Sequence, residues 1–180
     1  MVGITLREKA LQQQLVGLLP RLRRFARGLA GDRDKADDLV QETCERALTR
    51  LAQFQEGTRF DSWLYRIIYT RWIDAFRREK IRSAGLIRLA GEEDKPTGPI
   101  DPSSAHLATA MDIHDALKII PEEHRAAIIL VSVEGYSYKE AADVLNVPIG
   151  TVASRVARAR TILNRLLSRG HSESEAAVTG

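Results

Sequence analysis

Apolar side chains recur at helical spacing along nearly the whole chain, and the alternating pattern of a strand is almost absent. Near the N-terminus one such stripe includes Leu11, Leu15, Leu22 and Phe25, and Pro20 predicts a break or kink within it. With 180 residues, 44% of them apolar and 28% charged, the composition is that of a soluble globular protein of one ordinary or two small domains. The sequence therefore predicts an all-α protein.

The helical pattern collapses between residues 83 and 104, where glycines, prolines and acidic residues gather. Such a stretch is typical of a linker. We therefore expect a first helical domain over 1–81, a flexible linker over 82–105, and a second domain over 106–169. The polar segment 170–180 is predicted to be a disordered tail.

Local signals place the ends of several expected helices. Asp32 or Asp34 is predicted to cap the second helix, and Asp61 or Ser62 a helix that runs to about residue 80. In the second domain we expect helices over 106–120, from Pro121 toward Gly135, over 137–145 and over 151–167.

Charge is unevenly distributed, although 27 Lys and Arg residues nearly balance 24 Asp and Glu residues. Acidic residues dominate 32–45, basic residues dominate 65–80, and 151–169 holds five arginines without an acidic residue. One acidic and two basic blocks indicate more than one charged partner. The alternative interpretation is that each block is a solvated helix face.

The most specific local pattern covers residues 137–160. Ser137 and Glu140 have the spacing of a capping box, and a short helix, a tight turn and an arginine-rich helix follow. This is the layout of a helix-turn-helix, whose second helix enters the major groove of DNA. A plain helical hairpin with a solvated basic face is the alternative, which the absence of acidic residues from the second helix disfavours.

Aromatic residues are concentrated in the helix expected over 61–80. Tyr65, Tyr69, Trp72 and Phe76 share one face at helical spacing, beside several basic residues. Aromatic rings stack on unpaired bases while basic side chains follow the phosphates. Core packing explains the same spacing, and for this pattern taken alone it is the stronger interpretation.

Enzyme and metal sites have little support in the sequence. The four histidines are scattered without cysteine or carboxylate at metal-ligand spacing, and the single cysteine, Cys44, falls on or near an apolar helix face. We expect no catalytic residue, no metal and no cofactor. No apolar run approaches the roughly 18 residues of a membrane span, and no secretory signal is evident, so we expect a cytoplasmic protein without membrane insertion.

Four segments together resemble the extracytoplasmic-function (ECF) branch of the bacterial sigma-70-type initiation factors, over about residues 18–167. The segment 37–42 (DDLVQE) is similar to the family's region 2.2, and 60–67 (FDSWLYRI) with 73–78 (IDAFRR) to regions 2.3 and 2.4. Segments 120–125 (IPEEHR) and 134–142 (EGYSYKEAA) resemble the start of region 4, and 147–155 (VPIGTVASR) resembles its recognition element.

The resemblance implies two small helical domains, a region 2-like bundle and a region 4-like helix-turn-helix domain, joined by a flexible linker. The first would bind the clamp helices of the polymerase β′ subunit and open the −10 element. The second would read the −35 duplex and dock on the β flap. Family members are commonly held inactive by an anti-sigma factor, which we expect as a further partner.

The same resemblance implies three sets of site residues. Polymerase binding is expected at Asp37, Asp38, Gln41, Glu42 and Glu45. Binding of the −10 strand is expected at Arg59, Phe60, Trp63, Arg66, Tyr69, Thr70, Trp72, Asp74, Arg77, Arg78 and Lys80. Binding of the −35 duplex is expected at Ser137, Lys139, Thr151, Ala153, Ser154, Arg155, Arg158 and Arg160.

Two positions depart from the family pattern. Thr70 stands where the family usually has Asn, and Ala153 stands where a basic residue is common. We therefore expect base reading to depend more on Ser154, Arg155 and Arg158, or on apolar contact. Two other functions remain open at this point: a dimeric helix-turn-helix regulator that binds duplex DNA without polymerase, and an adaptor protein that binds through its acidic face.

Overall fold

In the computed structural model, which describes residues 5–89 and 113–178, the first helix, α1, spans Leu6–Ala30. A capping box begins it: the Thr5 hydroxyl accepts from the Glu8 amide at 3.2 Å, and the Glu8 carboxylate accepts from the Thr5 amide at 2.8 Å. Gly31, with φ of 65°, ends it. Of the break or kink expected at Pro20, the break is wrong, because the helix continues through this exposed residue and buries its apolar stripe on both sides.

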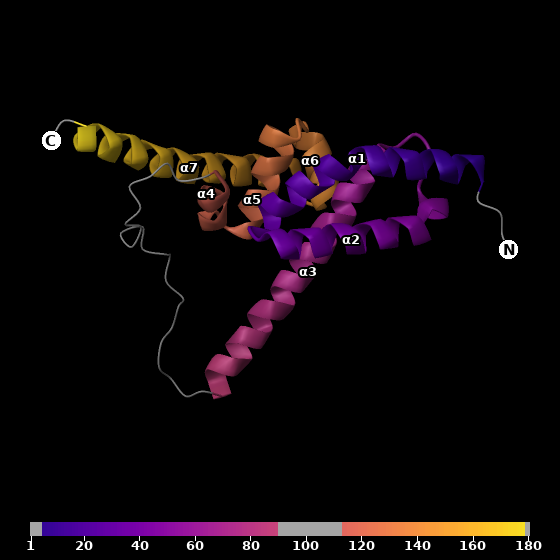
Figure 1. The fold of residues 1–180 in the computed structure, drawn as a ribbon, viewed down its shortest axis with the longest axis horizontal. Coiled ribbons are helices and arrows are strands. Elements are labelled where there is room, and N and C mark those ends of the chain that lie inside the picture. The colour runs from indigo at the N-terminus through magenta and orange to yellow at the C-terminus, as the bar shows by residue number, and fades with distance from the viewer. Residues whose placement is uncertain (1–4, 90–112, 179–180) are drawn as a thin grey trace.

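Two further helices complete the first domain. Helix α2 spans Arg33–Thr49, and the Asp32 carboxylate caps it by accepting from the Lys35 amide at 2.9 Å. After the short 3-10 helix η1 (Leu51–Gln53), α3 spans Phe60–Leu89. It begins earlier than the predicted cap at Asp61 or Ser62 and ends later than residue 80. The C-terminal half of α3 projects away from the rest of the molecule (Figure 1).

Within the described residues, the second domain is built from four short helical segments and one long helix. These are α4 (Ile113–Ile119), α5 (Glu122–Ile128), the π-helical segment η3 (Ile129–Val133), α6 (Tyr138–Leu145) and α7 (Ile149–Val178). The capping box of Ser137 and Glu140 is confirmed at the start of α6. Asn146, with φ of 54°, makes the turn into α7.

Two expected segments differ from the structure or lie outside it. Helix α7 continues through Val178, whereas the sequence predicts a helix end near residue 167 and a disordered tail. Residues 90–105 of the expected linker, and 106–112 of the expected helix after it, lie outside the described residues. The part of the linker from 82 to 89 is helical, as the end of α3.

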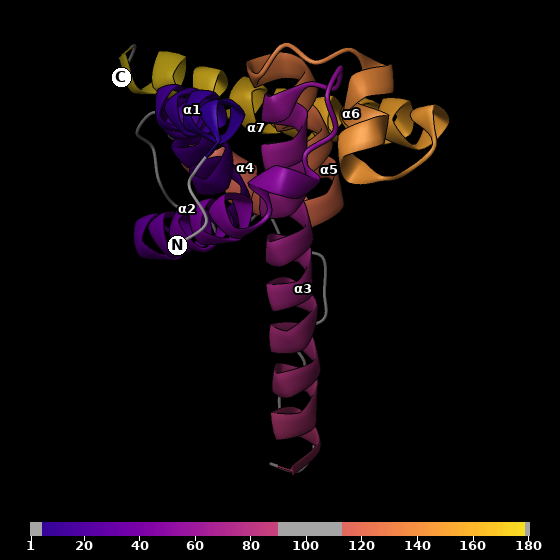
Figure 2. The ribbon, with the colours of Figure 1, turned by 90° about the vertical axis from the view of Figure 1, so that its right-hand side faces the viewer.

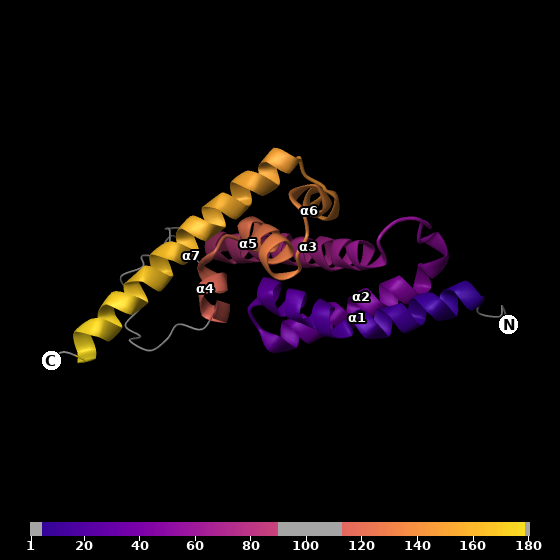
Figure 3. The same ribbon diagram turned by 90° about the horizontal axis from the view of Figure 1, so that it is seen from above.

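The two helical domains pack against each other around one continuous core (Figures 2 and 3). Helix α6 lies along α3, and α5 lies against α1. The largest fully buried side chains come from both domains, and include Phe25 and Tyr65 of the first and Ile129 and Leu130 of the second. The all-helical fold is confirmed, and the two domains share a buried interface.

Candidate nucleic-acid and partner interfaces

The acidic face of α2 is open to solvent. The expected polymerase-binding residues are all exposed, and they are Asp37, Asp38, Gln41, Glu42 and Glu45. The opposite face buries Ala36, Leu39, Val40, Thr43 and Ala47 in the core, which fixes the direction in which the acidic side chains point. Glu42 is tied to α3 by an ion pair with Arg71, at 2.6 Å between Oε2 and Nη2. The face is thus a rigid acidic surface suited to a basic partner.

The aromatic side chains of α3 are largely part of the core. Phe60, Tyr69 and Trp72 are 7%, 9% and 8% exposed, and Trp63 is half-buried. Phe60 and Trp63 pack with Phe54, at ring-centroid distances of 5.1 and 5.6 Å from it. In this arrangement of the domains these rings pack on protein, so the structure favours the core interpretation of the aromatic pattern.

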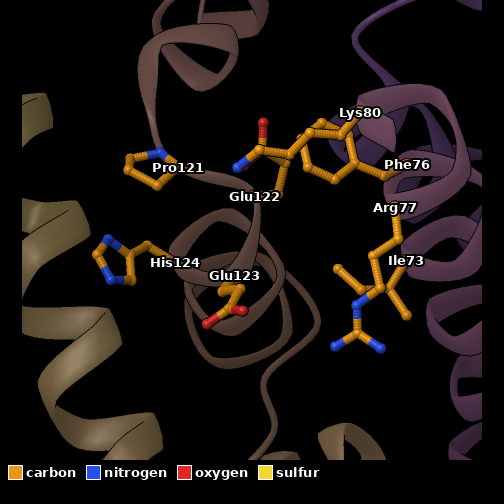
Figure 4. A pocket seen from close by; sticks show the side chains of 8 residues that line it. All are labelled: Ile73, Phe76, Arg77, Lys80, Pro121, Glu122, Glu123 and His124. Carbon is orange, nitrogen blue, oxygen red and sulfur yellow. The ribbon is translucent and has the colours of Figure 1, made fainter. Parts of the chain in front are cut away.

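The polar −10 candidates lie on the exposed side of α3. Thr70, Asp74, Arg77, Arg78 and Lys80 are exposed, the last four on or near the projecting half of the helix. Arg77 and Lys80 also line a cleft of about 300 Å³ between α3 and the start of α5. Figure 4 shows the acidic Glu122 and Glu123 on its other wall. Basic residues of the first domain and acidic residues of the second thus line the same cleft.

A second cleft, of about 420 Å³, lies between the loop before α3, the first turns of α3, and α6. Arg59, Trp63 and Arg66 line it from the first domain, and Glu140 and Asp143 from the second. The Arg59 guanidinium forms an ion pair with Glu140 and another with Asp61, the latter at 2.8 Å. Arg66 donates to the backbone carbonyl of Asp143. Both arginines thus already have acceptors within the protein.

The helix-turn-helix presents most of its expected −35 residues to solvent. Ser137, Lys139, Ala153, Ser154, Arg158 and Arg160 are exposed, and Thr151 is half-buried. The Ser137 hydroxyl serves the α6 capping box. Val152, Val156 and Ala159 are buried and set the face that α7 presents.

Arg155 differs from its neighbours on α7. Its side chain is 13% exposed and forms an ion pair with Glu123 of α5. It also lies beside Tyr69 of α3: burial raises the pKa of the Tyr69 phenol, and the nearby Arg155 charge opposes that rise. The expected base-reading arginine is thus placed between the two domains.

Glu134, on which the domain interface converges, is not among the site residues expected from the sequence. Its carboxylate is 0% exposed and accepts from Arg24 Nε at 2.9 Å, Arg21 Nε at 3.1 Å and the Tyr65 hydroxyl at 2.5 Å. These three donors come from α1 and α3, more than 60 positions away in sequence, and no local pattern marks such a contact. Burying a charge is costly unless it is paired and hydrogen-bonded, and here it is both.

Other polar groups extend this interface. Arg21 also pairs with Asp61 at 3.5 Å, and the Ser62 hydroxyl bonds to that of Tyr136 at 3.1 Å. Burial raises the pKa of Tyr136 to about 12. Burial also raises the pKa of Asp61, but hydrogen bonds from Arg59 and Tyr136 outweigh it, and the net shift is downward. The carboxylate is therefore charged at neutral pH and contributes to the network.

Buried Arg125 links the end of α1 to the second domain. Its guanidinium donates to the carbonyls of Leu29, Lys118 and Ile120 at 2.7, 2.9 and 3.0 Å. Leu29 is in the last turn of α1, where unpaired carbonyls and the helix dipole favour a cation.

Among the helices that the structure describes, none is both long and apolar enough to cross a membrane.

Comparison with known proteins agrees with this organisation. Residues 16–81 match the family described as Sigma-70 region 2, and residues 110–163 match Sigma-70, region 4. The chain is 36% identical over 158 residues to the ECF RNA polymerase sigma factor EcfG of Rhodopseudomonas palustris, covering 88% of this chain and 85% of that one. It is also 36% identical to the ECF RNA polymerase sigma factor SigM of Mycobacterium tuberculosis, over 81% of this chain and 71% of the relative.

Two solved structures are similar over most of the chain. One is the sigma factor RpoE in complex with the anti-sigma factor NepR from Bartonella quintana, with a TM-score of 0.71, 34% identity and coverage of 89% of this chain and 98% of that one. The other is CnrH in complex with the cytosolic domain of CnrY, with a TM-score of 0.64, 25% identity and 89% coverage of both chains.

These matches decide between the three functions that the sequence left open. Both domains fall in one family, in the order and at the positions that the motifs predicted. The family's role is not enzymatic. The chain belongs to the ECF sigma factors of the sigma-70 family, which direct RNA polymerase to promoters.

Proposed function

We propose that this sigma factor divides its work among three surfaces: α2 binds core RNA polymerase, α3 engages the −10 strand, and the helix-turn-helix reads the −35 duplex. The observation that carries this proposal is the separation of exposed charge. Acidic residues cover the free face of α2, whereas basic residues cover the projecting half of α3 and the free face of α7. An acidic face repels nucleic acid, and a basic face attracts it.

The α2 surface is proposed to contact the clamp helices of the β′ subunit. Asp37, Asp38 and Gln41 project from the helix opposite its buried stripe, so they are free to meet a basic partner. The Glu42–Arg71 ion pair fixes one edge of this surface to α3. The second domain is proposed to dock on the β flap.

The −10 strand is proposed to follow α3 from the cleft at Arg59 and Arg66 toward Arg77, Arg78 and Lys80. The first-domain wall of this cleft carries the aromatic Trp63 and two guanidinium groups, which suits an unpaired base with its phosphates. Thr70 and Asp74 are exposed between the two basic ends and are proposed to contact the strand.

The −35 element is proposed to bind along the first half of α7. Ala153, Ser154 and Arg158 form its exposed face, and Lys139 of α6 and Arg160 are placed for phosphates. With Ala at 153, that position is suited to an apolar contact such as the methyl group of thymine.

An anti-sigma factor is proposed as a regulatory partner, acting in the cytoplasm, where the polymerase works. The proposal is supported by the two similar structures, each of which is a complex of a sigma factor with another protein, named as the anti-sigma factor NepR in one and as CnrY in the other.

Run-off transcription with core polymerase on a promoter library tests the proposed function. We expect polymerase-dependent initiation at promoters that share two short elements. A variant with Arg77→Ala and Lys80→Ala should retain polymerase binding and lose initiation, whereas Arg82→Ala, at an exposed residue paired within the same helix, should retain both. Binding of the free chain to duplex DNA as a dimer, without any initiation, would overturn the proposal.

A further inference from the structure

A buried ion pair joins the two domains beside the apolar core that they share. Glu134 of the second domain is fully enclosed, and Arg21 and Arg24 of α1 and Tyr65 of α3 donate to its carboxylate. The two arginine side chains are 35% and 53% exposed, so water can solvate them when Glu134 leaves. Both oxygens of the Glu134 carboxylate accept hydrogen bonds from these residues. Its burial therefore depends on the first domain staying in place.

Acidic groups of the second domain meet the first-domain bases at positions proposed for promoter DNA. Glu140 pairs with Arg59, and the Asp143 carbonyl accepts from Arg66. Helix α6 therefore supplies oxygen acceptors to both guanidinium groups that line the cleft of about 420 Å³. Glu122 and Glu123 line the other cleft, opposite Arg77 and Lys80 (Figure 4). The Glu140 carboxylate and the Asp143 carbonyl thus already accept from the two guanidinium groups to which phosphate oxygens would bind under the proposed function.

Arg155, which is expected to read the −35 duplex, also lies at the interface between the two domains. Arg155 is 13% exposed, paired with Glu123 and placed beside Tyr69 of the first domain, while Arg158, one turn further along α7, is exposed. A side chain in this position is not available to a base edge in the major groove. The same contact covers Tyr69, which is 9% exposed.

We propose that this arrangement is a self-inhibited state, in which Glu134 holds the domains closed and α6 covers the first-domain surface at Arg59 and Arg66 that the −10 strand would use. No second protein is needed to form it, because every contact is within one chain. Opening requires Glu134 to leave its three donors, and it separates Arg59 and Arg66 from their acceptors on α6 and Arg155 from Tyr69. The inference rests on the proposed function for the identity of the ligand that α6 excludes, but the closed state can be tested separately.

The first test measures the distance between the domains in the free, full-length chain. Spin labels are placed on cysteines at the exposed positions Gln13 of α1 and Thr161 of α7, in a Cys44→Ala background. The wild type should give one narrow distance distribution, and Glu134→Ala a longer and broader one. Arg24→Glu, which places a carboxylate beside Glu134 without emptying a buried site, should open the chain as well. Glu79→Ala, at an exposed residue that pairs within α3, is the matched control and should not.

The second test measures binding of a short single-stranded oligothymidylate to the same proteins without polymerase. If the closed state excludes the strand, its apparent affinity scales with the open fraction, and both opening variants should bind roughly tenfold more tightly than the wild type. The Glu79→Ala control should bind as the wild type does.

The outcomes separate this inference from the proposed function. If the distance between the domains is unchanged in both Glu134→Ala and Arg24→Glu, Glu134 does not hold the domains closed. If the distances are longer but oligothymidylate binds no more tightly, the closed state does not exclude the strand. In either case initiation by the wild type with core polymerase would leave the proposed function intact. Failure of that initiation would count against the proposed function, whatever the distances show.

Discussion

Gly28 of α1 lies directly against Ile129 of η3, so closely that a Cβ atom at position 28 would be 2.6 Å from Ile129 Cδ1. Glycine inside a helix costs up to about 1 kcal/mol relative to alanine, and here its lack of a side chain lets the two domains approach. We expect Gly28→Ala to weaken the domain interface despite its better helix propensity. The spin-label distance described above checks this.

Gly17 is a matched control for Gly28. It lies in the same helix, and nothing comes within 4 Å of a Cβ atom built there. Gly17→Ala should therefore raise the free energy of unfolding by up to about 1 kcal/mol without changing the distance between the domains. Identical behaviour of the two variants in urea unfolding and in distance would contradict the role assigned to Gly28.

Reversing charge on α2 should weaken binding to core polymerase. Asp38→Arg with Glu42→Arg replaces two exposed acids on the proposed contact face by bases. The lost Glu42–Arg71 pair is partly exposed and worth at most about 1 kcal/mol, so the fold should persist. Fluorescence titration with core polymerase measures the loss. Glu79→Arg on α3 serves as the control, and equal affinities for the double variant and wild type would reject the surface.

Arg155→Ala should reduce −35 affinity in the holoenzyme by about 1–3 kcal/mol if the guanidinium bonds to a base. The loss should depend on sequence, which competition between cognate and altered −35 duplexes measures. In the free chain Arg155→Ala should change the affinity for the −35 duplex little, because the Arg155 side chain is turned toward Glu123 and Tyr69. Arg165→Ala, at an exposed residue further along α7, is the control. A uniform loss across sequences would make Arg155 a phosphate contact.

Trp72→Ala should lower the free energy of unfolding by about 3–5 kcal/mol, as expected for a large buried aromatic side chain. Its ring is 8% exposed and stacks on Phe76 at 6.1 Å between centroids. Thr70→Ala, at an exposed position of the same helix, should change it by no more than about 0.5 kcal/mol. Urea denaturation gives both values. A small effect of Trp72→Ala would show that the ring is not required for the core and leave it free for DNA.

Features set by neighbours in sequence could be predicted, and features set by the meeting of the domains could not. The capping box at Ser137 and Glu140 and the cap at Asp32 depend on residues three apart, so their letters suffice. Glu134 is an ordinary acidic residue before a glycine until the fold brings Arg21, Arg24 and Tyr65 to it. The same applies to Arg155, which the spacing on α7 places correctly but whose burial depends on α3.

Pro20 shows the opposite error, in which a strong local signal was overruled. Proline removes one hydrogen bond from a helix interior and disfavours it. Leu15 and Leu22 on either side are buried in one stripe, and this burial outweighs the local cost. The aromatic spacing on α3 was ambiguous for a different reason, because core packing and base stacking select the same residues.

His124 should make stability depend on pH. Its ring Nδ1 is buried without a hydrogen-bond partner among the described residues. Burial, and then the charges of Arg158 and Arg155, lower its pKa below 6.5, while Glu123 opposes them. The unfolded chain therefore takes up a proton more readily than the folded one as the pH falls through 6.5, so stability is full above that pH and is lost as the pH passes through the lowered value.

The measurement is urea unfolding of the wild type and His124→Gln, above pH 6.5 and at about pH 5.5, where the two states of the wild type differ in bound protons. Glutamine keeps a polar side chain at the edge of the cleft but does not titrate. We expect acidification to lower the free energy of unfolding of the wild type more than that of the variant. Above pH 6.5 the difference between the two free energies should not change with pH. Parallel losses in both proteins would assign the acid sensitivity to other groups, because only the titration of His124 distinguishes the two chains.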